Sequence, residues 1–307
     1  MRIPLIDAEE LHRVLPMSAA IDALAEAFRG ALPEAPLRSH VETAAGSLLL
    51  MPAVGSSGVG VKLVTLTPGN PGAGLPLIHA AYVLFDAATQ APVALIDGAA
   101  LTALRTAAVS GLATRYLAEP EAARLVLFGA GVQARAHLDA MQAVLPIERV
   151  VVVSRGRGPS EGLVSQARAV GLDAELGTPE AVAEAQVVCT CTTSPVPVFD
   201  GNLLAEGVHV NAVGAYTPET RELDTTTVQR SRLVVETREV AMAEAGDLLI
   251  PLRDGAIDEE HVVADLSEVV GGAPVRRSPS DVTAFKSVGV AFEDLVVAGA
   301  AAARAIG

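Results

Sequence analysis

The hydrophobic pattern in the first third of the chain predicts one amphipathic helix followed by short strands. Apolar residues recur at helical spacing from residue 21 to residue 28, with Ser18 as the expected N-cap and Gly30 as the expected end. From about residue 40 to residue 97, Gly and Pro separate short apolar runs, which predicts a meander of antiparallel strands. A long, Ala-rich helix is expected from about residue 100 to residue 118.

After Pro120 the pattern changes to continuous apolar runs that alternate with helical segments. "RLVLFG" precedes the helical stretch "VQARAHLDAMQAVL", and "RVVVVS" precedes "SEGLVSQARAVG". Further strand-like runs are "AQVVCTCT", "GVHVNAVG" and "SRLVVE". Apolar strands separated by helices are typical of a parallel sheet that is buried on both faces. The final segment, "FKSVGVAFEDLVVAGAAAARAIG", is expected to end in a second Ala-rich helix.

Together the two patterns predict an α/β protein with two domains. One is a doubly wound parallel sheet of the Rossmann type, and the other is an α+β domain with a mainly antiparallel sheet. A length of 307 residues is long for one hydrophobic core, which also favours two domains.

The composition is apolar but does not indicate a membrane protein. Half of the residues are hydrophobic and the mean hydropathy is +0.42, yet only 3% are aromatic, so the core must consist mainly of Ala, Val and Leu. The longest apolar runs without charge are too short for a spanning helix. The first residues, "MRIPLIDAEE", are acidic where a signal peptide would be apolar, so we expect a cytoplasmic protein without a membrane partner.

A formal net charge of −14 makes nucleic acid an unfavourable partner. The two cysteines, Cys189 and Cys191, alternate along one expected strand. Without further Cys or paired His residues they favour packing or pocket lining, so no metal site is expected.

A glycine-spaced turn suggests a nucleotide site. Gly129, Gly131 and Ala134 form a G-x-G-x-x-A pattern between an expected strand and an expected helix. The first Gly permits a tight turn, the second lets the backbone approach a pyrophosphate, and the third small residue lets helix and strand pack closely. We therefore expect dinucleotide binding; the alternative is a tight turn in a similar sheet without a ligand.

The residues after the next expected strand bear on the choice of cofactor. An NAD site usually has Asp or Glu there, whereas this chain has Ser154, Arg155 and Arg157. A hydroxyl and a guanidinium suit a 2′-phosphate, which predicts NADP(H) in preference to NAD(H). The alternative is that these are solvated loop arginines and that either cofactor is accepted.

Basic residues are scarce in the first domain, so each is informative. Lys62 lies within an apolar strand pattern and could bind a carboxylate or transfer a proton, or it could face water. Arg105 lies among small residues in the Ala-rich helix, where a ligand could approach it, or it could be a surface arginine. Arg38 lies in a loop, and His79, taken alone, favours a packed strand histidine. These residues suggest an anionic substrate.

Six segments that span nearly the whole chain carry a family resemblance. They are "LLLMPA", "VKLVTLTPGN", "DGAALTALRTAAVSGLATRYLA", "GAGVQARAH", "NAVGA" and "FKSVGVAFEDL". In this order they resemble the ornithine cyclodeaminase/mu-crystallin family. The resemblance implies hydride transfer at the α-carbon of an amino acid or its imine, and a homodimer. It implies a substrate-binding and dimerisation domain at residues 1–118, a Rossmann dinucleotide-binding domain at 119–285, and a segment at 286–307 that returns to the first domain.

The resemblance also implies roles for individual residues. Arg38, Lys62 and Arg105 match the basic residues around the substrate carboxylate, and Lys62 is the expected catalytic residue for proton transfer near the imine nitrogen. Tyr216 is expected to contact the substrate. The expected cofactor-binding residues are His79, Arg105, Thr106, Gly129, Gly131, Val132, Gln133, Ser154, Arg155, Val213 and Ser287.

Two departures from the ornithine cyclodeaminase pattern point to a different substrate. Leu49 stands where those enzymes have a glutamate, and Tyr216 stands where they have an aspartate for the distal amine of ornithine. Burying that amine without a carboxylate would be costly. The sequence therefore favours an NADP(H)-dependent reductase of cyclic ketimine acids, with reduction of Δ1-pyrroline-2-carboxylate to proline as the prototype. The alternatives are an NAD-dependent ornithine cyclodeaminase, an alanine or N-alkyl amino acid dehydrogenase, and a non-enzymatic NADP-dependent binder of mu-crystallin type.

Overall fold

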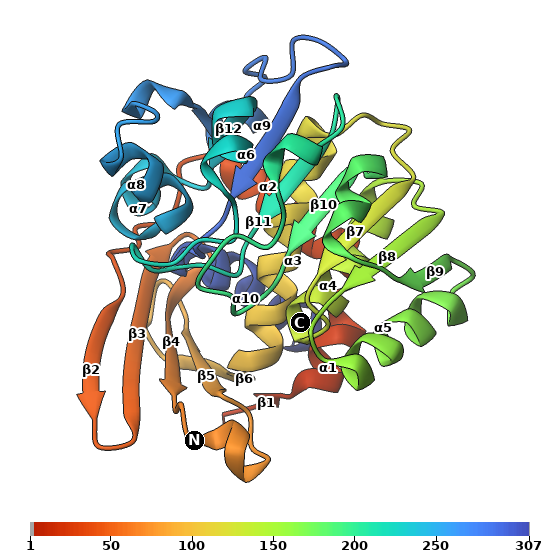
Figure 1. Cartoon of the computed structure of the whole chain (residues 1–307). Coiled ribbons are helices and arrows are strands. Elements are labelled where there is room, and N and C mark those ends of the chain that lie inside the picture. Colours follow the sequence, from red (N-terminus) through yellow and green to blue (C-terminus); the bar gives the residue numbers. More distant parts are fainter. Residues whose placement is uncertain (1–2, 307) are drawn as a thin grey trace. The chain divides into compact units, whose positions relative to one another are not determined.

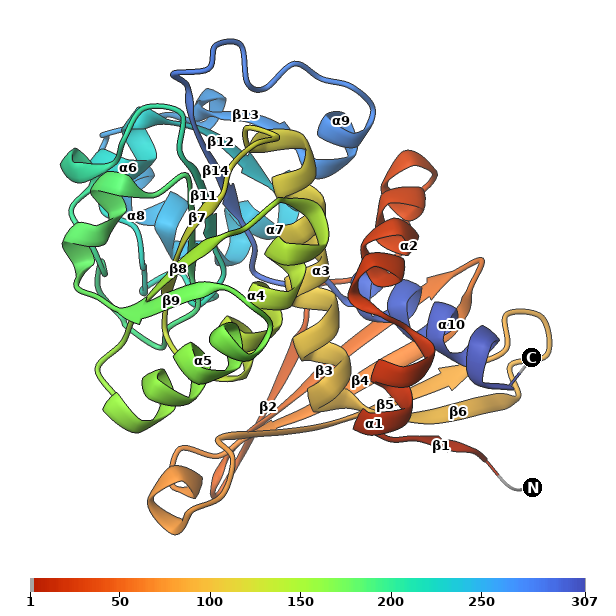
Figure 2. The same ribbon diagram turned by 90° about the vertical axis from the view of Figure 1, so that its right-hand side faces the viewer.

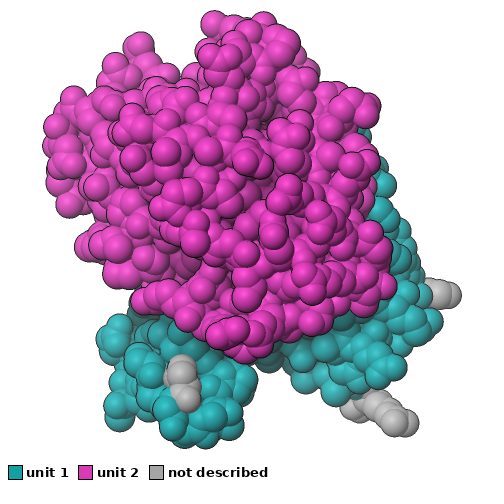
Figure 3. Space-filling model, turned by 45° about the vertical axis from the view of Figure 1, so that its right-hand side comes forward, with its two compact units in different colours: residues 1–108, 290–307 teal, residues 109–289 magenta. Residues whose placement is uncertain are grey.

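The computed structural model describes residues 3–306, which belong to two compact units (Figure 3). Among the described residues, unit 1 comprises 3–108 with 290–306, and unit 2 comprises 109–289. The C-terminal residues thus belong to the same unit as the N-terminal ones. The units divide at residues 108 and 289, and the expected domain limits were 118 and 285; the first division lies within the helix that links the units.

Unit 1 is built on a six-stranded sheet with the order β1-β6-β5-β4-β3-β2. Its strands are β1 (Leu5–Ile6), β2 (Ser39–Thr43), β3 (Gly46–Gly55), β4 (Gly58–Leu66), β5 (Ile78–Phe85) and β6 (Pro92–Asp97). Strands β2 to β6 pair antiparallel, which confirms the predicted meander, and β1 pairs parallel with β6. Its helices are α1 (Ala8–Val14), α2 (Met17–Arg29), the 3-10 helix η1 (Asn70–Ala73) and α10 (Ala291–Ile306).

One face of this sheet is buried and the other is partly open. Helix α10 packs against β3 and β4 and against α2 (Figure 2). Alternate residues of each strand, such as Leu49, Met51 and Tyr82, point to this side and are buried. Their neighbours on the opposite side, such as Leu50 and Val61, are half-buried.

The start of α2 differs from the expectation. The helix begins at Met17, so Ser18 lies inside its first turn and is not the N-cap. The N-cap is Pro16, in an extended conformation and without a side-chain capping bond. The expected core residues of this helix, from Ile21 to Phe28, are buried, and Gly30 is the C-cap as expected.

Unit 2 contains an eight-stranded sheet in which all strand pairs are parallel, with the order β13-β12-β14-β11-β10-β7-β8-β9 (Figure 1 and Figure 2). This confirms the predicted doubly wound parallel sheet. The strands are β7 (Arg124–Phe128), β8 (Arg149–Val153), β9 (Asp173–Leu176), β10 (Val187–Thr190), β11 (His209–Ala212), β12 (Ser231–Val235), β13 (Val262–Asp265) and β14 (Val282–Lys286). The helices are α4 (Val132–Val144), α5 (Arg157–Ala169), α6 (Thr225–Arg230), α7 (Arg238–Glu244), α8 (Gly246–Arg253) and α9 (Leu266–Val270), with 3-10 helices η2 (Pro179–Glu184), η3 (Gly201–Leu203) and η4 (Glu259–His261).

Helix α3 (Gly98–Leu117) crosses the boundary between the units, because its second half is bonded into unit 2. The Ser110 hydroxyl lies 2.9 Å from Nε2 of His137, and Thr114 accepts a hydrogen bond from the Asn211 amide at 2.9 Å. The carbonyl of Leu117 accepts a hydrogen bond from the Thr283 hydroxyl at 3.0 Å. These buried polar contacts explain why the boundary falls within the helix and not after it.

Two long helices carry much of the Ala content of the chain. Both α3 and α10 are Ala-rich and mostly buried. Within residues 3–306, no helix combines the length and the apolar character that crossing a membrane requires.

Candidate functional site

Unit 1 contains a buried lysine on the inner face of its sheet. Lys62 lies on β4, directly across from Met51 on β3 and Tyr82 on β5. The residue is only 1% exposed, so the prediction that it could simply face water is wrong. Its Nζ lies 2.9 Å from Oδ1 and 2.8 Å from Oδ2 of Asp294 on α10.

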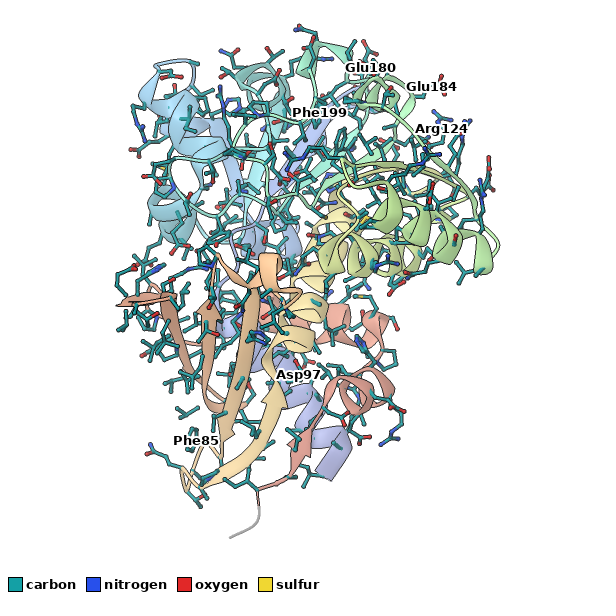
Figure 4. All side chains as sticks on the ribbon, turned by 60° about the horizontal axis from the view of Figure 1, so that its bottom comes forward. Phe85, Asp97, Arg124, Glu180, Glu184 and Phe199 are labelled. Carbon is teal, nitrogen blue, oxygen red and sulfur yellow. The ribbon has the colours of Figure 1, made fainter. Side chains whose placement is uncertain are left out.

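A second buried cation completes a charge-balanced cluster. Nε of Arg105 donates to Oδ1 of Asp294 at 3.1 Å, and its Nη1 donates to Oε2 of Glu293 at 2.9 Å. Asp97, labelled in Figure 4, accepts hydrogen bonds from the first backbone N–H groups of α3 and so fixes the start of the helix that carries Arg105. Arg105 is 5% exposed, which is not the exposure of a surface arginine. Two cations and two carboxylates are buried together, as low dielectric surroundings require.

Glu293 and Asp294 were not among the expected site residues. They are the only acidic residues after Asp281, and they stand in an apolar segment. Both side chains are fully buried in the first turn of α10. Two adjacent carboxylates in an apolar segment need cationic partners if the helix is buried. This pattern in the sequence could have identified both residues as members of the site.

The environment of Lys62 makes it a suitable proton donor. Burial, and after it the charge of Arg105, lower its pKa to about 8 against the opposing effect of the Asp294 carboxylate. A cationic acid whose pKa lies near the working pH can give up a proton during a reaction and recover it afterwards.

The other predicted residues of unit 1 lie in different environments. Arg38 is half-buried in the loop before β2, and its charge also lowers the pKa of Lys62. Thr106 is buried on α3 beside Arg105, whereas His79 is exposed near the start of β5. Leu49 is buried on the same face of β3 as Met51, the neighbour of Lys62.

The glycine turn of unit 2 has the backbone geometry expected of a phosphate site. Gly129 has a φ of +101°, and a Cβ there would lie 2.5 Å from the carbonyl oxygen of Cys191. Gly131 is the N-cap of α4, no side chain caps the helix, and a Cβ at Gly131 would meet nothing within 4 Å. Val132 is 68% exposed and Ala134 is fully buried. A helix N-terminus with open approach and no capping side chain fits a dinucleotide pyrophosphate.

The turn is held by packing behind it. Phe128, the last residue of β7, packs against Phe199 with ring centroids 5.3 Å apart. Phe199 is labelled in Figure 4. Cys189 is buried in β10, where burial raises the pKa of its thiol to about 12. This thiol is therefore a packing group in the sheet, in agreement with the expectation.

The loop after β8 presents the residues expected to bind a ribose phosphate. Ser154 and Arg155 are exposed, and the Ser154 hydroxyl accepts a hydrogen bond from the Gly156 N–H at 3.3 Å. The guanidinium of Arg157 pairs with Glu161 at 2.9 Å. For Arg155, the described part of the chain shows no hydrogen bond or ion pair, so its side chain can bind a ligand without losing a partner.

A buried carboxylate holds the segment after β14. Glu236 accepts hydrogen bonds from the Ser287 hydroxyl at 2.6 Å, the Val288 N–H at 2.9 Å and the Gly289 N–H at 2.9 Å. Ser287 is 1% exposed, and its hydroxyl is engaged by this bond. Glu236 was not expected from the sequence, because its partners lie about fifty residues later.

A second buried carboxylate holds the segment after β11 that contains Val213 and Tyr216, both of them half-buried. Glu222 accepts hydrogen bonds from the Gly214 N–H at 2.6 Å and from the backbone and hydroxyl of Thr192. Burial raises its pKa, and these bonds oppose the shift. Asp247 accepts from the backbone N–H of Glu222 at 2.8 Å and pairs with Lys286 at 2.8 Å.

Replacing Glu236 by alanine should destabilise unit 2. The substitution removes three hydrogen bonds to a buried carboxylate, at about 1.5–3 kcal/mol each, so we expect the free energy of unfolding to fall by at least about 3 kcal/mol. Urea unfolding measures this change. Glu175→Ala is the control, since it removes an exposed ion pair with Arg149 worth at most about 1 kcal/mol. Equal losses in the two variants would contradict the role of Glu236.

Comparison with known proteins supports the predicted family. A sequence model of the ornithine cyclodeaminase/mu-crystallin family matches residues 5–306. Delta(1)-pyrroline-2-carboxylate reductase of Bacillus cereus is 34% identical over 310 residues, which cover 95% of this chain and 94% of the relative.

Solved structures resemble the chain over nearly its whole length. The Delta(1)-pyrroline-2-carboxylate reductase of Thermococcus litoralis, in complex with NADH and L-proline, matches with a TM-score of 0.93 and 35% identity, covering 99% of this chain and 98% of the other. An archaeal alanine dehydrogenase dimer with bound NAD matches with a TM-score of 0.93 and 31% identity. The match covers 100% of this chain and 97% of the other. These relatives are nicotinamide-dependent oxidoreductases of imino and amino acids by name, in agreement with the predicted enzyme class.

Proposed function

Since the chain belongs to the ornithine cyclodeaminase/mu-crystallin family, we propose that it is an NADP(H)-dependent reductase of cyclic ketimine carboxylates, of the type that converts Δ1-pyrroline-2-carboxylate to L-proline. The observation that carries the proposal is the buried pair of cations, Lys62 and Arg105, on the inner face of the unit 1 sheet. The names of the B. cereus and T. litoralis relatives support the same reaction.

In the proposed reaction, Arg105 binds the substrate carboxylate, with help from Arg38, and Lys62 lies near the imine nitrogen. The glycine turn at Gly129–Gly131 and Arg155 would hold NADPH, which would supply the hydride for the α-carbon of the C=N bond. The Lys62 ammonium gives a proton to the nitrogen, so the imine becomes a secondary amine. Lys62 is left neutral and recovers its proton from solvent.

The substrate assignment rests on what stands at two positions. Leu49 is buried on the same face of β3 as the cross-strand neighbour of Lys62, so that position offers an apolar surface and not a carboxylate. Tyr216 offers a phenol where a cyclodeaminase has an acid. A cyclic imine without a distal amine suits these residues better than ornithine does.

The cofactor preference rests on Arg155. Its guanidinium has no partner within the described residues and follows β8, where an NAD site usually has an acid. NADP(H) is the proposed preference, with NAD(H) accepted more weakly; NADH is the nucleotide bound in the T. litoralis relative.

One assay tests the reaction. Purified protein is mixed with NADPH or NADH and with Δ1-pyrroline-2-carboxylate, Δ1-piperideine-2-carboxylate, or pyruvate with ammonia or methylamine, and absorbance at about 340 nm is followed. Fastest oxidation with a cyclic imine supports the proposal. Conversion of ornithine to proline without net NADPH oxidation would overturn it in favour of the cyclodeaminase. Fastest turnover with pyruvate would favour the amino acid dehydrogenase, and tight ligand binding without turnover would favour the binder.

The outer face of the unit 1 sheet supports a homodimer as the assembled state. Half-buried apolar side chains cover adjacent strands on the side opposite Lys62, and Leu50, Leu63 and Ala81 pair in one row across β3, β4 and β5. An apolar sheet face of this kind marks an interaction surface. A second copy of the chain is the proposed partner, and the archaeal alanine dehydrogenase relative is described as a dimer. The face includes Leu48, Leu50, Val59, Val61, Leu63 and Val83.

Leu63→Asp should convert the dimer to a monomer, because it places a charge at the centre of this face. Light scattering coupled to size exclusion would show the mass fall by half. Val170→Asp is the matched control, since Val170 is an apolar residue of unit 2 that is 60% exposed. A wild-type protein that is monomeric, or a Leu63→Asp variant with unchanged mass, would contradict the proposed interface.

A further inference from the structure

We propose that Asp294 is a positioning residue for proton transfer, whose carboxylate orients the Lys62 ammonium and keeps it protonated. This inference rests on the proposed function in that Lys62 is the proton donor. Asp294 has no role of its own in the proposed reaction, because it need not touch the substrate.

The contacts of Asp294 set the position of both cations. Its two carboxylate oxygens lie 2.9 and 2.8 Å from Nζ of Lys62, so the ammonium is bound from one side. Oδ1 also accepts from Nε of Arg105 at 3.1 Å. A single carboxylate thus joins the group proposed to bind the substrate carboxylate to the group proposed to protonate the nitrogen. The spacing between these two functions is fixed by one side chain.

The position of Asp294 is itself well supported. It lies in the first turn of α10, directly after Glu293, which bonds Arg105 through Nη1. Phe292, the residue before Glu293, packs edge-on against Phe28 of α2 with ring centroids 5.3 Å apart. The carboxylate therefore sits on a helix whose start is anchored by an aromatic contact, and its side chain is fully buried.

The charges around Lys62 explain why the carboxylate is needed. Arg105 from α3 and Arg38 from the loop before β2 disfavour a second cation, and burial acts in the same direction. Tyr82 on the neighbouring strand has a buried hydroxyl whose pKa is raised by burial, so it stays neutral. Glu293 bonds Arg105, and Asp294 alone forms an ion pair with Lys62 among the described residues. Without Asp294, the ammonium would lose its proton at lower pH.

The chain offers a direct test, because Lys62 and Lys286 are its only lysines. In protein labelled with [ε-13C]lysine, the Lys62 signal is identified by its loss in Lys62→Met and is titrated in the wild type and in Asp294→Asn. We expect the Lys62 pKa to fall by at least about one unit in the variant. Lys286, paired with Asp247 in unit 2, is the internal reference. An unchanged Lys62 titration would overturn the inference, whether or not the protein reduces imines.

The pH dependence of kcat/KM tests whether the Lys62 titration controls the reaction. Reduction needs protonated Lys62, so kcat/KM in the wild type should fall as the pH rises through about 8. In Asp294→Asn this alkaline limb should move to lower pH by the shift seen in the NMR titration. A rate that falls equally at every pH would indicate a merely structural role and would overturn the inference. A wild type that reduces no imine would reject the proposed function and leave the NMR result as the measure of the Asp294–Lys62 interaction.

Two further variants guard against loss of folding, since removing one partner of a buried ion pair costs about 3–5 kcal/mol. Asp294→Glu keeps the charge but displaces it, so we expect kcat to fall at least about tenfold with the alkaline limb unchanged. Wild-type kcat in this variant would overturn the inference even if Asp294→Asn does not fold. Glu293→Gln, which alters the partner of Arg105, should raise the KM for the imine and shift the limb less than Asp294→Asn does.

Discussion

Replacing Lys62 by methionine is expected to lower kcat/KM for the cyclic imine by at least about 10³-fold. Loss of a general acid removes about 10²–10⁴-fold from the rate, and loss of one cation beside the substrate carboxylate weakens binding as well. Methionine fills a similar volume in the buried site, and Asp294 retains its bond to Arg105, which offsets part of the about 3–5 kcal/mol that loss of one partner of a buried ion pair costs. Steady-state kinetics with NADPH measures the loss.

The comparison with Lys62→Arg separates the proton from the charge. Arginine keeps the positive charge beside Asp294 but does not release its proton near neutral pH. We therefore expect the arginine variant to retain substrate binding better than the methionine variant while remaining nearly inactive. NADPH binding, followed by fluorescence, should persist in both, because the glycine turn and Arg155 belong to unit 2. Wild-type turnover in either variant would remove Lys62 from the proton-transfer step.

The second large effect is expected at the cofactor. Arg155→Asp should weaken NADPH binding by about 10²-fold, because a charge-assisted contact to the 2′-phosphate is replaced by repulsion. NADH has a hydroxyl at that position, and the introduced aspartate can accept a hydrogen bond from it, so NADH binding should be retained or improved. Dissociation constants for both nucleotides, measured by fluorescence titration, give the change in preference.

Arg157→Asp provides the matched control for this substitution. Arg157 is two residues away, and its side chain is 87% exposed and paired with Glu161. Arg157→Asp changes the overall charge by the same amount as Arg155→Asp. We expect it to weaken NADPH binding far less, because Arg157 is not proposed to contact the 2′-phosphate. If the two variants lose NADPH affinity equally, the effect is one of general charge and Arg155 does not contact the 2′-phosphate. If Arg155→Asp weakens NADPH and NADH alike, the proposed preference is wrong.

The fold was predictable where local pattern and packing agree. The meander of unit 1 follows from short apolar runs that Gly and Pro separate, and β7, β8, β10, β11 and β12 follow from continuous apolar runs. The helix limits were close, although α2 begins at Met17 with Pro16 as its N-cap, one residue before Ser18. Strand β9 is short and largely exposed at the sheet edge, so its pattern is weak. Strands β13 and β14 were not anticipated either.

The candidate site was predictable only in part, because its carboxylates lie far in sequence from the cations that they bind. Lys62 and Arg105 stand out as cations among apolar or small residues, and their burial agrees with a functional role. Their carboxylate partners lie 232 and 188 residues away in sequence, and local pattern does not reveal such pairings. The same is true of Glu236 and the backbone groups that it binds. Such contacts become visible only when the topology is known.

The arrangement of the units has a consequence for the order in which the protein can be made. The whole of unit 2 is encoded between the two segments of unit 1, so α10 is synthesised after all of unit 2. Until then, Lys62 and Arg105 have no carboxylates to accompany them into the core, and burying them alone would cost several kcal/mol. Unit 2 can therefore fold before α10 is made, whereas unit 1 must wait for α10. The buried cluster thus makes the folding of unit 1 depend on α10, since a chain without this helix cannot bury the two cations together with their carboxylates.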